Sequence, residues 1–378
     1  MKINIQPLTS DLLPAVERFN TRIKSFDIPG RITPEANPET SPEPIDPSIV
    51  ERFVILDETD EIRGGYSLRR QELWHKGERH SAAHIGMPVS EGVADKRFAL
   101  MGMLLMRDAL QRAPLSYTLG AGGIEGQVFK ILRPLGWKAI DIPFFFRILN
   151  ASRFSRLLPQ IRRSKVRSAI GSLLGYSGIS SLLLHGLQCG SALRSGVIRP
   201  LNGAGDFLEI PDLQEVADEL WRKYSHEYQF SLLRDSRHCA AAFPPDRSEL
   251  RRLVVRRNGE PVGWAVVMTR GLSRITKFLG ELKVGLIVDC FGSIADAPAI
   301  VNAATAALKA EKVDVILTNQ SHSGWVGAFR SKGYLTYQSQ YPLMVSKAVS
   351  KQVGELESVL PHSHWTRADG DGVHYLRD

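Results

Sequence analysis

Residues 253–267 read Leu-Val-Val-Arg-Arg-Asn-Gly-Glu-Pro-Val-Gly-Trp-Ala-Val-Val. Two runs rich in β-branched and aromatic residues flank the dipeptide Asn258-Gly259, which is typical of a two-residue hairpin turn of type I′. The stretch therefore predicts an antiparallel β-hairpin. A second hairpin is predicted over 51–70, where the apolar run 53–56 and the strand 62–68 flank a polar turn.

The same order of elements follows both hairpins. After the hairpin at 51–70 the sequence predicts a strand over 81–89, a helix over about 98–112, a strand from 115, a helix over about 125–133 and a closing apolar segment over 140–149. After the hairpin at 253–267 it predicts a strand over 284–290, a helix over 297–309, a strand over 313–318, a helix over 325–331 and a last strand from 332. Gly64 and Gly136 are 72 residues apart, and Gly263 and Gly333 are 70 residues apart. This matched spacing favours duplication of one α/β unit, although any two α/β domains have some glycines and turns at similar places.

The start of the chain fits the same unit. A strand is predicted at 3–8, and Thr9-Ser10-Asp11 supplies N-cap chemistry for the helix that follows it. Six prolines between residues 29 and 47 then predict an irregular loop, either a lid or a plain surface loop.

This order of elements resembles the GNAT (Gcn5-related N-acetyltransferase) superfamily. Leu135-Gly136-Trp137 and Lys332-Gly333-Tyr334 each follow a short helix near the end of one copy, and residues 5–12 resemble the first strand and helix start of the family. The resemblance implies an α/β (α+β) fold of two tandem GNAT-like domains, each a mixed, mostly antiparallel sheet flanked by helices. The predicted parts are an N-terminal domain at 1–150, a basic helical linker at 151–203, a C-terminal domain at 204–350 and a tail at 351–378.

The resemblance also implies a donor site. GNAT enzymes bind acyl-CoA through a turn of pattern Q/R-x-x-G-x-G/A, where the amides at a helix N-terminus hold the pyrophosphate. In the first copy Arg97 and Gly102 fit this pattern, whereas Leu100 replaces the first glycine. The predicted site for acetyl-CoA or another acyl-CoA consists of Val89, Arg97, Leu100, Met101, Gly102 and Met103. The second copy has neither the leading Arg/Gln nor the paired small residues at 291–298, so it is expected to be structural or to bind the acceptor.

Direct transfer from a thioester needs a base for the attacking group, a donor for the oxyanion and an acid for the departing thiolate. The resemblance places the base on or near the fourth strand, where His84 and Glu91 are the titrating groups and the predicted catalytic residues. The family's tyrosine acid would fall at Leu132 and Phe329, and neither side chain can donate a proton. Either another group or water supplies the proton, or the site performs no acyl transfer. The polar candidates in the second copy are Asp289, His322 and Ser323.

No metal site is predicted. The three cysteines, Cys189, Cys239 and Cys290, are widely spaced and are expected to be reduced thiols. Residues 362–375 concentrate His and Asp, but they lack the ligand count of an EF-hand loop and a helical His pair at i and i+4. We expect a structural or acceptor-contacting tail.

The net charge comes from one segment. The chain has 48 Lys+Arg and 40 Asp+Glu, a formal charge of +8, and residues 151–200 carry eight basic side chains and no acid. These basic residues are Arg153, Arg156, Arg162, Arg163, Lys165, Arg167, Arg194 and Arg199. A neutral body with a local basic belt predicts a local anionic partner, such as a membrane surface bound through 153–199, and no nucleic acid. The charge-free run 168–193 is interrupted by glycines and serines, which suits interfacial attachment or an inter-domain helical hairpin.

The function expected from these features is that of an acyl-CoA-dependent N- or O-acyltransferase acting on an amine or hydroxyl. The residues 365–371 resemble the endings of tandem GNAT-like proteins linked to bacterial polysaccharide pathways, which implies an amino-sugar or polysaccharide-precursor acceptor. The N-terminus has no apolar signal segment, so we expect a cytoplasmic protein, peripheral on the inner membrane face. Two alternatives stay open: a non-catalytic binding or scaffold protein on degenerate copies, and a FemABX-like aminoacyl transferase, against which the neutral domains count.

Overall fold

The chain forms two compact units. The computed structural model describes residues 3–26, 28, 30–38, 46–124, 126–151, 153, 206–271, 283–337 and 341–370. Unit 1 consists of Met1–Leu73, Arg79–Ile140 and Pro342–Leu356, and unit 2 consists of Trp74–Glu78, Asp141–Tyr341 and Glu357–Asp378. The predicted linker lies outside the described residues except for Ala151 and Arg153.

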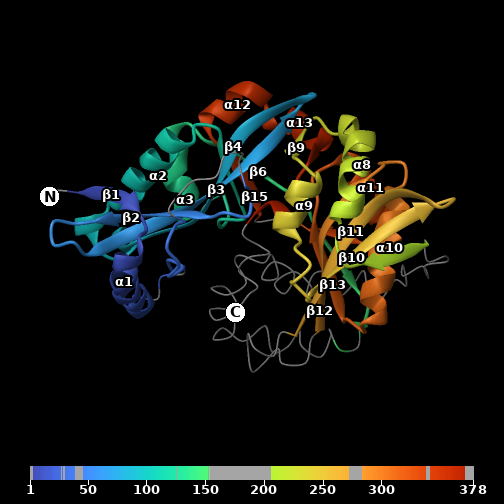
Figure 1. Ribbon diagram of the computed structural model, residues 1–378, viewed down its shortest axis with the longest axis horizontal. Helices are drawn as coiled ribbons and strands as arrows, with labels where there is room; N and C mark the ends of the chain where they lie inside the picture. The colour runs from blue at the N-terminus through green and yellow to red at the C-terminus, as the bar shows by residue number, and fades with distance from the viewer. Residues whose placement is uncertain are drawn as a thin grey trace. The chain divides into compact units, whose positions relative to one another are not determined.

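Unit 1 contains one twisted sheet with helices on both faces (Figure 1). Its elements are β1 (Asn4–Pro7), α1 (Leu13–Ser25), β2 (Glu51–Leu56), β3 (Ile62–His75), β4 (Glu78–Ser90), α2 (Met101–Arg112), β5 (Ser116–Leu119), α3 (Gln127–Leu132), β6 (Lys138–Asp141), β15 (Pro342–Val345) and α12 (Lys347–Val353). The described residues of the proline-rich segment 29–47 form no helix or strand, as predicted.

Alternation along the strands explains how the helices of unit 1 are placed. Phe53 and Ile55 of β2 lie in one core cluster with residues of α2 and α3. Val54 and Leu56 lie in a second cluster with residues of α1. Because successive strand residues point to opposite faces, α1 covers one face of the sheet and α2 and α3 cover the other (Figure 1).

Unit 2 repeats this arrangement. Its elements are β7 (Phe144–Ile148), β8 (Phe207–Ile210), α8 (Gln214–Tyr224), β9 (Phe230–Leu232), α9 (Ser236–Ala242), β10 (Leu250–Arg257), β11 (Glu260–Gly271), β12 (Lys283–Gly292), α10 (Ala297–Ala310), β13 (Val315–Asn319), α11 (Ser323–Ser331), β14 (Leu335–Tyr337), α13 (Leu356–Val359) and β16 (Ser363–His364). The helix α8 lies on the face of Trp264, because Trp221 of α8 stacks on Phe291 and the Phe291 ring lies 4.8 Å from that of Trp264. The helix α10 lies on the face of Gly263, where its Ile300 packs. Trp264 and Gly263 are neighbours in β11 and point to opposite faces, so helices cover both sides of this sheet too.

The two hairpins share details that confirm the predicted equivalence. The turn residues Asn258 and Gly259 have φ angles of 53° and 86°, as a type I′ turn requires. Both hairpins carry a register shift beside the glycine: Ile55 pairs with Gly64 and the next residue pairs with Ile62, while Val255 pairs with Gly263 and the next residue pairs with Pro261.

These glycines also allow a close backbone approach. A Cβ on Gly64 would lie 2.7 Å from the carbonyl oxygen of Val89, and a Cβ on Gly263 would collide with that of Phe291. The same two positions therefore need glycine for the same reason. Val89 of β4 in the first copy is therefore equivalent to Phe291 of β12 in the second copy.

The copies exchange a strand. The first sheet has the order β1-β2-β3-β4-β5-β15-β6, and the second has the order β14-β7-β13-β12-β11-β10-β8. The strand β7 thus comes from the first half of the sequence but pairs with β13 and β14, and β15 comes from the second half but pairs with β5. The predicted ranges 1–150 and 204–350 treat each copy as one continuous segment, whereas contacts assign 141–150 to unit 2 and 342–356 to unit 1.

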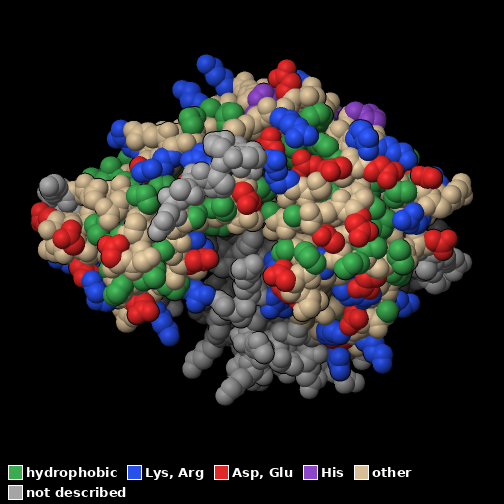
Figure 2. Space-filling model, viewed as in Figure 1, with side chains coloured by type: hydrophobic (Ala, Val, Ile, Leu, Met, Phe, Trp, Pro, Cys, Tyr) green, Lys and Arg blue, Asp and Glu red, His purple; other side chains and the backbone are tan. Residues whose placement is uncertain are grey.

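The described surface carries both signs of charge. Lys and Arg side chains are interspersed with Asp and Glu side chains over the visible face (Figure 2). This matches a sequence in which residues outside 151–200 have as many acids as bases. None of the helices in the described part of the chain combines the length and the apolar character needed to cross a bilayer.

Candidate functional site

The predicted donor site lies where β4 and β5 part. These parallel strands are paired at Ala83–Ser116 and His84–Tyr117, and β4 then continues for six more residues to Ser90. The carboxyl ends of the two strands therefore diverge. The turn that joins β4 to α2 starts at this end of β4.

The turn is stabilised by hydrogen bonds between residues that are close in sequence. It contains two single 3₁₀ turns, Glu91–Val93 and Lys96–Phe98. The Ser90 hydroxyl accepts from the Gly92 amide at 3.1 Å, and the Asp95 carboxylate accepts from the Arg97 amide at 2.9 Å. A Cβ at Gly92 would collide with the carbonyl oxygen of Phe98, so the turn closes tightly only with glycine at this position.

The outer side of the turn is exposed. The Arg97 side chain is 80% exposed and forms an ion pair of 2.6 Å with Asp95. Val93, Leu100 and Met103 are three of the six large apolar side chains that are exposed among the described residues. The first-turn amides of α2 lack intrahelical acceptors, and the helix dipole adds positive potential there. A polyphosphate with apolar groups attached fits this combination of cation, amides and apolar side chains.

The predicted donor residues fall into two groups. Arg97, Leu100 and Met103 lie on the surface of the turn and of the first turn of α2. Val89 and Met101 are buried, Val89 in the core cluster with α1 and Met101 in the core cluster on the other face of the sheet. Gly102 lies in the first turn of α2, where a Cβ would come within 3.0 Å of the Ile131 side chain.

Glu91, predicted as a candidate base, is buried and ion-paired. Its side chain is 3% exposed, and its two carboxylate oxygens accept from Arg22 Nε at 2.7 Å and from Arg63 Nη1 at 2.9 Å. Arg63 also binds Asp57 at 2.7 Å. The catalytic role of Glu91 stays a prediction, and these contacts supply a second role for it.

His84 lies on the other face of the sheet from α2. Its neighbours Ala83 and Ile85 belong to the core under α2, and alternation turns His84 away from that core. The ring is 2% exposed and its centroid is 5.2 Å from that of Tyr117, whose hydroxyl donates to Gln71 Oε1. The role of His84 as general base stays a prediction.

The corresponding turn of unit 2 is shorter, and carboxylates of the chain itself form hydrogen bonds and ion pairs there. The length of each turn follows from the spacing between equivalent residues. Leu105 packs at Gly64 and lies 16 positions after Val89. Ile300 packs at Gly263 and lies only nine positions after Phe291. The Ile294 amide donates to the Glu227 carboxylate at 2.8 Å. Asp296, immediately before α10, forms an ion pair with Arg257. The role of the second copy, structural or acceptor-binding, stays a prediction.

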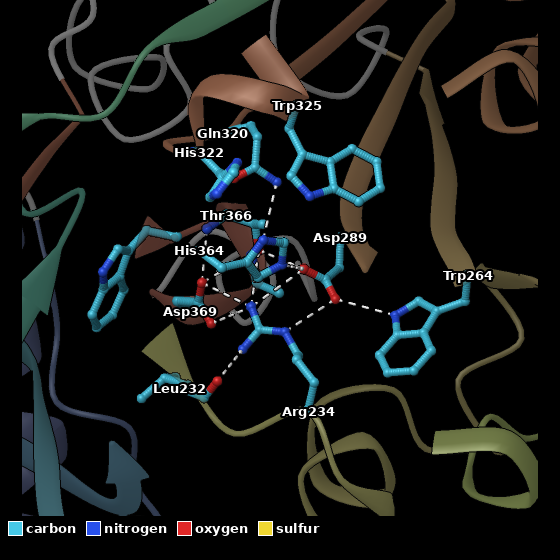
Figure 3. Close-up of polar contacts among 12 residues, drawn as sticks. Leu232, Arg234, Trp264, Asp289, Gln320, His322, Trp325, His364, Thr366 and Asp369 are labelled. Carbon is cyan, nitrogen blue, oxygen red and sulfur yellow. Dashed lines mark hydrogen bonds and ion pairs between the residues drawn. The ribbon is translucent and has the colours of Figure 1, made fainter. Parts of the chain in front are cut away.

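A buried ionic cluster occupies the core of unit 2 (Figure 3). Arg234, Asp289 and Asp369 have fully buried side chains, and the guanidinium contacts the two carboxylates at 3.3 and 2.7 Å. The Thr366 hydroxyl donates to Asp289 at 2.8 Å. Burial alone would raise the pKa of Asp289, but the nearby Arg234 and the hydrogen bonds it accepts hold that pKa well below its ordinary value. Buried charges of this kind require such pairing, so the cluster ties its elements together.

The C-terminal tail is part of this cluster. Trp365 and Ser321 exchange two hydrogen bonds, of 2.8 and 3.2 Å, and Thr366 forms a β-bridge with Gln320. Because Gln320 follows β13 and Asp289 lies on β12, the tail connects the carboxyl ends of these two strands. The described tail residues 363–369 are buried, which supports the structural role expected for the tail.

Two polar candidates of the second copy, His322 and Asp289, belong to one network that runs from the His322 amide through Gln320 and His364 to the Asp289 carboxylate (Figure 3). His322 caps α11 by accepting from the Gly324 amide at 3.1 Å, and burial lowers its pKa to about 4. Ser323 is exposed at the start of the same helix, and Asp289 belongs to the ionic cluster. His364 is fully buried, with its two ring nitrogens 3.5 Å from Gln320 Nε2 and 3.7 Å from Asp289 Oδ1. Across the described ranges, no group of three His, Cys, Asp or Glu side chains is placed to hold a metal ion.

The tyrosine acid of the family has no counterpart at the expected positions. Leu132 and Phe329 are each 1% exposed and lie in the apolar cores. Two alternatives therefore stay open: another group or water supplies the proton, or the site performs no acyl transfer.

Sequence reasoning missed the arginines that organise both units. Arg22 and Arg63 hold Glu91, and Arg234 holds Asp289, yet none of these arginines belongs to a recognisable motif. One signal was available: Asp289 interrupts the apolar strand 284–291. Since charged side chains are almost never fully buried unless paired, a partner of opposite charge could have been expected.

Comparisons with known proteins identify the fold. No protein-family model matches the chain, and no curated protein matches it by sequence. Among solved structures, N-myristoyltransferase of Saccharomyces cerevisiae with bound myristoyl-CoA is similar at 9% identity, 91% coverage of this chain, 82% coverage of that chain and a TM-score of 0.53. A GCN5-related N-acetyltransferase from Anabaena variabilis is similar at 9% identity, 91% and 72% coverage and a TM-score of 0.54. A probable N-acyltransferase from Enterococcus faecalis is similar at 10% identity, with the same two coverages and a TM-score of 0.51.

The likeness extends over both units, and the features described above agree with it. Each sheet is mixed and mostly antiparallel. The parallel strands β4 and β5 of the first sheet are joined through α2, and the parallel strands β12 and β13 of the second sheet are joined through α10. The chain therefore has the GNAT fold, in two tandem copies.

Proposed function

We propose that this chain is an acyl-CoA-dependent acyltransferase that binds its donor at the turn between β4 and α2. The difference between the two copies carries the proposal. In unit 1 this turn is long and presents Arg97 and three exposed apolar side chains. In unit 2 the corresponding turn is short and Glu227 takes up one of its amides.

The groups at the turn match the parts of a CoA ester. The first-turn amides of α2 and the Arg97 guanidinium are suited to the pyrophosphate, which carries the negative charge of the donor. Val93, Leu100 and Met103 offer apolar contact to its uncharged parts. The yeast neighbour was solved with bound myristoyl-CoA, which supports a thioester donor without fixing the chain length here.

The proposed reaction is direct transfer to an amine or hydroxyl. The acceptor attacks the thioester carbonyl, the carbon–sulfur bond breaks, and the thiolate takes up a proton as CoA leaves. His84 is the proposed base, since it lies on β4 near the point where β4 and β5 part. We propose that unit 2 contributes to acceptor binding, with an amino-sugar or polysaccharide precursor as the acceptor class suggested by the tail sequence. We propose peripheral attachment to an anionic membrane through 153–199 from the sequence. Arg153 is the one residue of this segment that the structure describes, and it forms an ion pair of 3.4 Å with Asp314.

The proposal is tested by comparing two arginines of unit 1. Arg97→Ala is expected to weaken CoA binding about tenfold, because it removes a charged hydrogen bond to the donor phosphates at a solvent-exposed position. Arg79→Ala is the matched control, since Arg79 is also an exposed, ion-paired arginine but lies in the β3–β4 hairpin. Binding is measured by calorimetry and transfer by thiol release from acetyl-, octanoyl- and myristoyl-CoA. Equal losses in both variants, or none in Arg97→Ala, would refute the site.

One observation favours a second candidate, a binding protein without transferase activity. The positions of the family's tyrosine acid are buried apolar residues in both copies, Leu132 and Phe329. Such a protein would bind CoA at the turn and release no thiol with any acceptor. Thiol release that depends on Arg97 would exclude it.

A further inference from the structure

We infer that Glu91 is a positioning residue. Its ion pairs with Arg22 and Arg63, called the clamp below, hold the turn between β4 and α2 (the donor turn) in the conformation that binds the donor. The inference rests on the proposed function, and it gives Glu91 a role other than that of general base. Arg22 comes from α1, Arg63 from β3 and Glu91 from the turn itself. The clamp therefore joins three elements that are far apart in the sequence.

The contacts of Glu91 are suited to holding a backbone segment. Its carboxylate is 3% exposed and accepts from both arginines at 2.7 and 2.9 Å. Its backbone carbonyl accepts from the amides of Ala94 and Asp95 at 3.0 and 2.9 Å. The side chain thus anchors the residue to the body of unit 1, and the carbonyl fixes the chain that follows it.

The clamp extends to the exposed cation of the site. The Arg63 guanidinium lies 4.5 Å from the centre of the Phe98 ring, and that of Arg97 lies 5.5 Å from the same ring. Both distances are within the range of cation–π attraction. Phe98 therefore links the arginine that holds Glu91 to the arginine proposed to meet the phosphates.

The charges of the clamp are themselves fixed by neighbours. Arg22 binds Glu61 at 2.9 Å as well as Glu91. Arg63 binds Asp57 at 2.7 Å; burial alone would raise the pKa of this carboxyl, but hydrogen bonds from Thr59 and Arg63 hold it at about 2. Each arginine of the clamp is therefore held by a second carboxylate besides Glu91.

The clamp is present only in the copy that has the open turn, among the residues that the structure describes. Arg63 precedes Gly64, and the residue before the corresponding Gly263 is Val262. Glu91 lies two positions after Val89, and the residue two positions after the corresponding Phe291 is Ser293. Unit 2 thus lacks both the carboxylate and this arginine, together with the long turn that they hold.

The test compares substitutions inside and beside the clamp in the full-length protein. Glu91→Gln keeps the shape but removes the charge, and Arg63→Lys keeps the charge but removes the planar fork. Arg18→Gln is the control, because Arg18 binds Glu61 in the same ionic network at 2.9 Å and does not contact Glu91. Three quantities are measured: the Kd of CoA, KM and kcat for acetyl-CoA with their pH profiles, and amide hydrogen exchange over 91–103.

The inference predicts faster exchange over 91–103 in Glu91→Gln and Arg63→Lys, and a Kd and KM about tenfold higher, since a turn that must be ordered on binding lowers affinity. It also predicts an unchanged kcat and pH profile, and no effect of Arg18→Gln. Unchanged exchange in both clamp variants would overturn it, as would a kcat that falls at constant KM with loss of the acidic limb of the profile, which is the signature of a base. Failure of the unsubstituted protein to bind CoA would instead refute the proposed function, and hydrogen exchange would still decide whether the clamp holds the turn.

Discussion

Asp141, the last residue of β6, has a partly buried carboxyl group whose charged form is disfavoured. Burial raises its pKa to about 6, and its Oδ1 has no hydrogen-bond partner among the described residues. The folded protein thus binds this proton more tightly than the unfolded chain, whose Asp pKa is about 3.9. As pH rises from about 4 to 6 the native state alone holds the proton, so stability falls through this window and stays lower above it.

The substitution Asp141→Asn should therefore stabilise the protein at high pH. We expect a gain of about 1–2 kcal/mol at pH 8 that shrinks towards zero as pH falls from 6 to 4. Denaturant unfolding at several pH values measures it, with the exposed Asp206→Asn as control. A variant no more stable than the unsubstituted protein at pH 8 would contradict the assignment of this charge.

Residue identities at the site were partly within reach of the sequence. The placement of Arg97 and Gly102 at the turn before α2 could be predicted because the motif spans only six positions, and their role in donor binding stays a prediction. The partners of Glu91 could not, since Arg22 lies 69 residues earlier and its contact depends on how α1 packs. Local chemistry can be predicted from spacing, whereas the pairing of buried charges follows from tertiary structure.

At the scale of elements, the exchange of β7 and β15 leads to a specific expectation. Met344 of β15 is fully buried in the core of unit 1, although its sequence neighbours before 341 belong to unit 2. Met344→Asp would place an unpaired charge in that core and should destabilise unit 1 by about 3 kcal/mol or more. Hydrogen exchange should therefore rise in β5, the strand paired with β15.

The control for this experiment is Leu335→Asp in β14, because Leu335 is 39% exposed. It should leave β5 protected. If Met344→Asp raised exchange in β13 and left β5 unchanged, the exchanged pairing would be wrong.

The order of elements could be predicted from the sequence, but the membership of the sheets could not. The hairpins, the type I′ turn at Asn258-Gly259 and the helices at 101–112 and 297–310 follow from local periodicity and turn chemistry. Residues 144–148 are apolar at nearly every position, which predicts a buried strand in any sheet. Which sheet receives it depends on edges that form only when the whole chain folds.

For the whole molecule, the difference between the copies predicts one donor per chain. Calorimetric titration with CoA should give a stoichiometry of one. Gly102→Glu should abolish binding, because it adds a negative charge where the donor phosphates are proposed to lie. Ala295→Glu, at an exposed position of the corresponding turn in unit 2, should leave binding unchanged. Two sites per chain, or loss of binding in Ala295→Glu, would show that the copies had been assigned the wrong roles.

The exchanged strands also limit how such a gene can change over generations. A tandem duplication normally leaves one copy free to decay, because the other still folds and works. Here each half of the gene encodes a strand that completes the sheet of the other half, so removing either half leaves a gap between two strands of the survivor. Both halves are therefore needed for complete sheets, even where only one of them carries a binding site.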